Sequence, residues 1–75
     1  MYDYKIKLGR NMKEIRQNAR LSVNQLAYYF GVKPETLKDY ESGNLSVPTL
    51  ILSEYIDIKN DNGKEVKKWI KQHLS

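Results

Sequence analysis

Two residues that interrupt helices, Gly31 and Pro34, stand three positions apart between two short segments with helical patterning. Glycine ends a helix at least cost because it adopts the left-handed backbone conformation readily. Proline has a fixed backbone angle that suits the first position of the next helix. The sequence therefore predicts one helix over residues 23–30, a tight turn, and a second helix over residues 34–42. Two short helices joined in this way cross at a steep angle.

The first of these two helices begins with a capping signal. Ser22 and Gln25 have the spacing of a capping box, in which each side chain bonds to the backbone amide of the other residue. Ala27 is small enough to let the two helices approach closely. The apolar residues expected to fill the angle between them are Val32, Leu37 and Tyr40. Residues 23–42 thus have the pattern of a helix-turn-helix unit.

Helical patterning continues on both sides of this unit. On the N-terminal side, apolar residues recur in steps of four, three and four from Leu8 to Ala19. On the C-terminal side, Pro48 opens another apolar pattern, residues 61–63 have the composition of a turn, and an apolar stripe includes Trp69. The sequence therefore predicts an all-α fold, a single five-helix domain over residues 1–75. The expected helices span residues 4–18, 23–30, 34–42, 49–57 and 63–74.

The composition restricts the partners and the location of the chain. Thirteen Lys and Arg against nine Asp and Glu give a net charge of +4, which is compatible with a polyanionic partner. The absence of cysteine excludes disulfides and thiolate metal sites, and we expect a reducing, cytoplasmic location. Apolar runs are short, as at residues 50–52, so we expect no membrane partner.

Catalysis is not expected. His73 is the single histidine, and no nucleophile or metal-ligand spacing surrounds it. Asp39 and Glu41 lie two positions apart on one predicted helix, so their side chains point about 200° apart and cannot act on one substrate. We therefore predict no enzyme activity, no catalytic residue, no metal and no cofactor.

A set of short motifs extends over most of the chain and can be compared with a known family. The motifs lie at residues 21–27, 30–32, 36–37 and 40–43, and at Pro48. Together they resemble the Cro/repressor-type helix-turn-helix family, also called the xenobiotic-response-element family. The resemblance implies a five-helix, lambda-repressor-like domain that places its third helix in the major groove of double-stranded DNA, usually as a homodimer on two half-sites. The implied function is that of a sequence-specific transcriptional regulator, repressor-like and of bacterial or phage origin.

The resemblance also implies roles for individual residues. Arg16 and Glu41 match a pair that forms an internal, structural ion pair in relatives. The candidates for reading bases are Lys33, Glu35, Thr36 and Asp39. The candidates for contacting phosphates are Ser22, Val23, Asn24, Lys38, Ser42, Asn44 and Ser46.

A second interpretation keeps the scaffold and changes the partner. Small helix-turn-helix proteins of phages and mobile elements sometimes bind a repressor or a toxin, and a fold does not fix a function. Glu35 and Asp39 are repelled by the field of the phosphates, and Val23 stands where relatives often carry glutamine. These residues favour a protein-interaction module, either a modulator of a repressor or an antitoxin-like protein. The net charge, the basic first helix and the complete helix-turn-helix pattern favour DNA.

Overall fold

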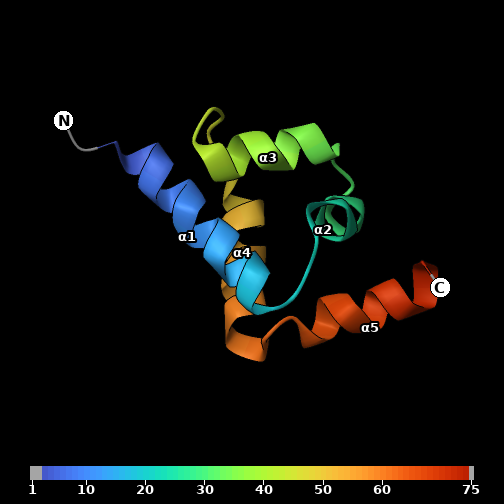
Figure 1. Ribbon diagram of the computed structural model, residues 1–75. Helices are drawn as coiled ribbons and strands as arrows, with labels where there is room; N and C mark the ends of the chain where they lie inside the picture. The colour runs from blue at the N-terminus through green and yellow to red at the C-terminus, as the bar shows by residue number, and fades with distance from the viewer. Residues whose placement is uncertain (1–2, 75) are drawn as a thin grey trace.

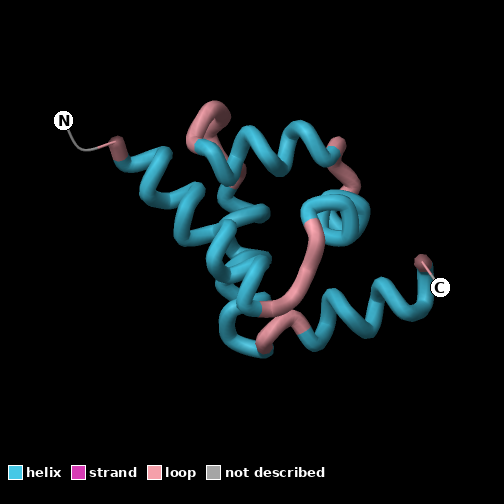
Figure 2. Tube along the Cα trace, in the orientation of Figure 1, coloured by secondary structure: helices cyan, strands magenta, loops and turns pink. Residues whose placement is uncertain are grey.

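The computed structural model describes residues 3–74 of the chain. Over these residues it contains five α-helices and no strand, which confirms the all-α prediction. The helices are α1 (Tyr4–Asn18), α2 (Val23–Phe30), α3 (Pro34–Ser42), α4 (Thr49–Asp61) and α5 (Lys64–His73). In Figure 1, α3 lies along the upper edge of the molecule above α2, the N-terminal part of α1 lies to its left, and α5 lies below. The tube in Figure 2 shows that short loops join consecutive helices.

Helix α4 is longer than the sequence pattern predicts. The expected end was residue 57, but the helix continues to Asp61 because Ile58 still faces the core, where it is almost fully buried. It ends where Asn62 and Gly63 both adopt left-handed conformations, with φ angles of 56° and 77°. The last helix is correspondingly shorter at each end than the predicted residues 63–74, since Gly63 precedes it and Leu74 has left helical geometry.

Capping residues set both ends of α2, the first helix of the predicted helix-turn-helix unit. The Ser22 hydroxyl accepts a hydrogen bond from the Gln25 amide at 3.0 Å, and the Ser22 amide donates to Gln25 Oε1 at 2.9 Å. Gly31 ends α2 with a φ of 72°, and the Val32 amide donates back to the Ala27 carbonyl at 3.0 Å. These local bonds fix the direction in which the chain enters α3.

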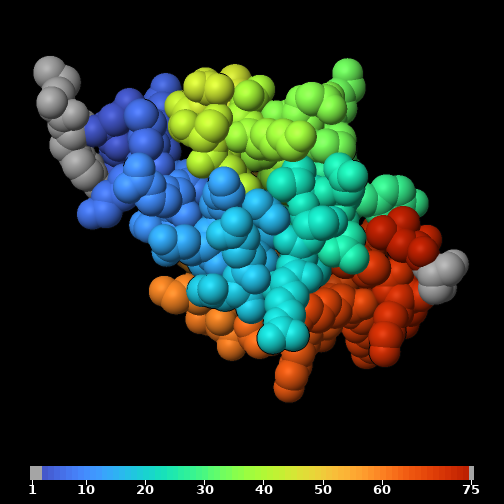
Figure 3. All heavy atoms as spheres, viewed as in Figure 1, coloured from blue at the N-terminus to red at the C-terminus, as the bar shows by residue number. Residues whose placement is uncertain are grey.

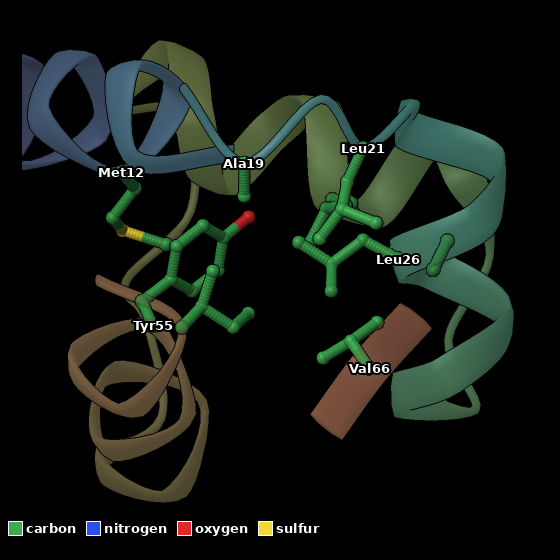
Figure 4. Packing of buried hydrophobic residues seen from close by; sticks show 9 residues of the cluster. Met12, Ala19, Leu21, Leu26, Tyr55 and Val66 are labelled. Carbon is green, nitrogen blue, oxygen red and sulfur yellow. The ribbon is translucent and has the colours of Figure 1, made fainter. Parts of the chain in front are cut away.

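The core collects side chains from every helix and from the loop after α1 (Figure 4). Leu26 of α2 and Leu37 of α3 are both 0% exposed, and these two helices pack against each other. The buried apolar residues are Met12, Ala19, Leu21, Leu26, Ala27, Leu37, Tyr55, Ile58 and Val66. Burial of this cluster provides most of the favourable free energy of folding.

Helix α1 lies directly against the backbone of α3 at Gly9. A Cβ atom at this position would lie 2.4 Å from the carbonyl oxygen of Glu41 and 2.7 Å from that of Tyr40. Because both atoms belong to the backbone, neither could move aside cheaply. Gly9 therefore allows α1 to cross the C-terminal half of α3 in direct contact, which sets the orientation of α3 on the domain.

Candidate nucleic-acid interface

Helix α3 presents a polar face to solvent. Glu35, Lys38 and Ser42 recur with helical spacing and are exposed, while Leu37 on the opposite side is buried. In the space-filling view this helix and the loop after it form the upper rim of the molecule (Figure 3). The face is accessible along the length of the helix.

The four candidate base-reading residues differ in exposure. Lys33, which precedes the helix, and Glu35, in its first turn, are exposed. Thr36 and Asp39 are half-buried at the flanks of the outer face. The structure thus places all four on or beside one side of α3, with Lys33 and Glu35 the most accessible.

The start of α2 contributes backbone donors next to this face. The Leu26 amide donates to the Ser22 carbonyl at 3.1 Å, and the Gln25 amide donates to the Ser22 hydroxyl. The helix has no intrahelical acceptor for the preceding two amides, those of Val23 and Asn24. The positive end of the helix dipole lies at the same place, so this terminus attracts anions.

A shallow depression of about 300 Å³ joins α1, α2 and α3. Three of the candidate phosphate contacts, Val23, Lys38 and Ser42, meet there. Lys13 of α1 adds a second ammonium group that the sequence did not single out. The sequence feature that points to Lys13 is its position three residues before Arg16, because residues at this spacing lie on the same side of a helix. Arg16 and Glu41 also line the depression, and their charges are paired with each other. The depression therefore combines the ammonium groups of Lys13 and Lys38 with the start of α2, a suitable environment for one phosphate group.

The other candidate phosphate contacts lie around the edge of this depression or away from it. Ser22 and Asn24 are exposed at the start of α2. Asn44 and Ser46 are exposed in the loop after α3, outside the depression. The Asn44 amide fixes the start of this loop by donating to the Asp39 carbonyl at 2.9 Å.

An ion pair behind α3 connects this helix to α1 and α4. Arg16 donates from Nε and Nη2 to the two oxygens of Glu41, at 2.8 and 3.0 Å. Arg16 Nη1 donates to the Leu21 carbonyl at 2.9 Å, and the Tyr55 hydroxyl donates to Glu41 Oε2 at 2.8 Å. Arg16 and Glu41 are only 7% and 8% exposed. The network therefore connects α1, α3 and α4 through buried, fully paired groups.

The tyrosine of this network is held in its protonated form. Burial and the adjacent Glu41 carboxylate raise the pKa of Tyr55 far above its ordinary value of 10.0, and the nearby Arg16 offsets part of this effect. The hydroxyl therefore remains a hydrogen-bond donor to the carboxylate over the whole neutral range.

The His73 ring stacks on Trp69 with a centroid distance of 4.3 Å, and His73 Nδ1 lies 2.8 Å from the Trp69 carbonyl oxygen. Among residues 3–74, no cluster of His, Asp and Glu side chains is arranged to hold a metal ion. Within the same range, no helix has the length and apolar character needed to cross a bilayer.

Comparison of the chain with protein-family models, with curated proteins and with solved structures finds no match. The candidate interface therefore rests on the residues and the geometry described above.

Proposed function

We propose that this protein is a sequence-specific double-stranded DNA-binding transcriptional regulator with a lambda-repressor-like arrangement, in which α3 enters the major groove. The observation that carries the proposal is the depression lined by Lys13, Val23, Lys38 and Ser42 beside the exposed face of α3. In this proposal one backbone phosphate occupies the depression and fixes the register of the domain on the duplex.

The placement of charge supports this mode of binding. The ammonium groups of Lys13 and Lys38 attract the phosphate, and the amides of Val23 and Asn24 donate to its oxygens. A helix with its side chains is about 10–12 Å across, and the major groove is about 12 Å wide. With the phosphate held beside it, the outer face of α3 meets the base edges.

The acidic residues of α3 then define a base preference. A carboxylate accepts a hydrogen bond from the amino group of cytosine, whereas it is repelled by phosphates. Glu35 is exposed in the first turn of α3, where it can reach such an amino group. We therefore expect cytosine at the position that Glu35 contacts, and weak binding to duplexes that lack it. Lys33, just before the helix, can donate hydrogen bonds to O6 and N7 of a guanine in the same binding site.

The proposal also includes the homodimer that the family resemblance implies. Two copies would place two α3 helices on half-sites about one helical turn apart, so the preferred duplex is expected to be palindromic.

The test begins with selection of a preferred duplex from a random pool, followed by salt titrations of the protein and its variants. Lys13→Gln and Lys38→Gln are each expected to lower the slope of log affinity against log salt by about one, with no change in sequence preference. Glu35→Gln is expected to change the preferred base without lowering that slope. Lys68→Gln, on the exposed side of α5, is the matched control and should bind as the unmodified protein does.

The alternative function, a protein-interaction module on the same scaffold, is favoured by two of the three carboxylates of α3, Glu35 and Asp39. Absence of salt-dependent duplex binding at about 50 mM salt would reject the DNA proposal and leave this alternative.

A further inference from the structure

A second surface, away from α3, is formed by α2, α4 and α5. Its apolar part is a groove of about 480 Å³ whose walls include Phe30, Leu50 and Trp69. An acidic hollow of about 400 Å³ continues it, and Tyr29 and Glu54 line both. We refer to the groove and the hollow together as the α4–α5 groove.

The apolar part of the groove includes hydrophobic side chains that are exposed to solvent. Leu50, in the first turn of α4, is 80% exposed. A single exposed leucine is ordinary. Here, however, Leu50 borders the half-buried side chains of Phe30, Ile51 and Trp69, so the apolar surface is continuous. A continuous patch bordered by charged groups is typical of an interaction site.

The acidic part concentrates negative charge in a chain that is basic overall. Its carboxylates are Glu54, Asp57, Asp61 and Glu65, four of the nine in the chain. Across residues 3–74, no lysine or arginine forms an ion pair with any of them. Asp61 accepts hydrogen bonds from the amides of Gly63 and Glu65, and the Glu54 carboxylate interacts with the Tyr29 hydroxyl.

The hydroxyl of Tyr29 responds to this charge. Its pKa is raised above the ordinary value of 10.0, first by burial and then by the charges of Glu54 and Glu65. The carboxylates therefore act together on a group at the junction of the apolar groove and the acidic hollow.

We propose that the α4–α5 groove binds an amphipathic helix of a partner protein, with leucine-like side chains on one edge and lysine or arginine on the other. The apolar edge would cover Leu50 and Trp69, and the cations would pair with Asp57 and Glu65. This is the helix-in-groove mode of recognition, and the unneutralised carboxylates select a basic helix over an acidic one.

The same charges argue against the other occupants of the groove. A two-fold contact centred on the acidic hollow would place the carboxylates of one copy against those of the other. A nucleic acid would be repelled as well. The proposed site contains no residue of α3, so it does not depend on the proposed DNA binding.

Trp69 is the single tryptophan of the chain and lines the groove, so its fluorescence reports binding. The probe is a synthetic helical peptide of about four turns, with leucine on one face and arginine on the other. Two matched peptides replace all arginines with glutamate or all leucines with serine. The proposal expects the unmodified peptide to bind at least about tenfold more tightly than either matched peptide, a difference of about 1.4 kcal/mol.

Variants of the protein locate the binding. Leu50→Ser and the double variant Asp57→Asn/Glu65→Gln are each expected to weaken binding of the arginine–leucine peptide about tenfold. Leu50, Asp57 and Glu65 are all exposed, so these changes leave the fold intact. Ile56→Ser, at an exposed position of α4 outside the groove, is the matched control and should bind normally.

Two results would overturn the proposal. One is equal affinity of the peptide for the unmodified protein and both groove variants. The other is a dimer in sedimentation experiments that Leu50→Ser abolishes, which would assign the groove to a second copy. Duplex binding, measured separately on the same Leu50→Ser variant, is expected to be unchanged and so tests the DNA proposal independently.

Discussion

Replacing Glu41 with leucine tests how the interior supports α3. The carboxylate accepts three hydrogen bonds, two from Arg16 and one from Tyr55, at 2.8–3.0 Å. Glu41→Leu leaves the guanidinium buried without its counter-charge, which costs about 3–5 kcal/mol. The Tyr55 hydroxyl also loses its acceptor, at a cost of about 1–3 kcal/mol that partly overlaps the first. A domain of this size has a free energy of unfolding of about 4–11 kcal/mol, so the variant should be close to unfolded.

Removing both charges should restore much of this loss. The double variant Arg16→Met/Glu41→Leu contains no buried lone charge and is expected to be about 2 kcal/mol more stable than Glu41→Leu. It still leaves the Tyr55 hydroxyl and the Leu21 carbonyl without the partners they have in the structure. Adding Tyr55→Phe should recover about 1 kcal/mol more, because it removes the orphaned hydroxyl.

Urea unfolding followed by circular dichroism measures these differences as shifts of the midpoint at constant slope. A cost of less than about 1 kcal/mol for Glu41→Leu would show that the Glu41 carboxylate does not stabilise the buried Arg16 side chain. The coupling of the two residues is refuted if the effects of Arg16→Met and Glu41→Leu simply add, since a coupled buried pair requires non-additivity.

Three further predictions concern backbone fit, capping and pH. Gly9→Ala should lower the free energy of unfolding by about 3 kcal/mol, because the new Cβ would lie 2.4 Å from a backbone oxygen. A Cβ at Gly31 would have no atom within 4 Å, and only the φ of +72° is unfavourable, so Gly31→Ala should lower the free energy of unfolding by only about 1 kcal/mol. Thermal unfolding measures both variants, and equal losses for Gly9→Ala and Gly31→Ala would contradict the role given to Gly9. Ser22→Ala should cost about 1 kcal/mol through loss of the capping box, measured by the same unfolding experiment. The raised pKa of Tyr55 contributes stability that is complete below pH 10 and is lost as the pH rises above it, since the unfolded chain ionises first. Between about pH 9 and 10.5 the unmodified protein should therefore lose about 0.8 kcal/mol more than Tyr55→Phe, and parallel pH profiles would refute the assignment.

The boundaries of the first three helices could be predicted from local signals. Gly31 and Pro34 determine the turn between α2 and α3 through their own backbone preferences, which need no tertiary information. The end of α4 was placed too early because apolar spacing alone did not show that Ile58 remains in the core. Its real stop signal, the pair Asn62 and Gly63, was present but was assigned to a turn that began one residue earlier.

Contacts between distant segments could not be predicted in the same way. Gly9 lies in the middle of a helix, where glycine has no favourable local role, and its importance appears only where α1 crosses α3. The spacing of Lys13 and Arg16 places both on the same side of α1, but only the packing of the helices shows that this side borders the depression. The α4–α5 groove combines Tyr29 of α2 with Glu54 and Glu65 from two other helices, and no sequence period links them.

Chemical-shift mapping by NMR with a selected duplex tests most directly whether α3 and the start of α2 contact DNA. The account predicts the largest amide shifts at Val23, Asn24 and residues 33–46, with little change on the outer side of α5. These shifts should disappear as salt is raised from about 50 to 200 mM, because phosphate contacts dominate the affinity. Shifts centred on Leu50 and Trp69, or no shifts with any duplex at the lower salt, would contradict the claim that this protein binds DNA through α3.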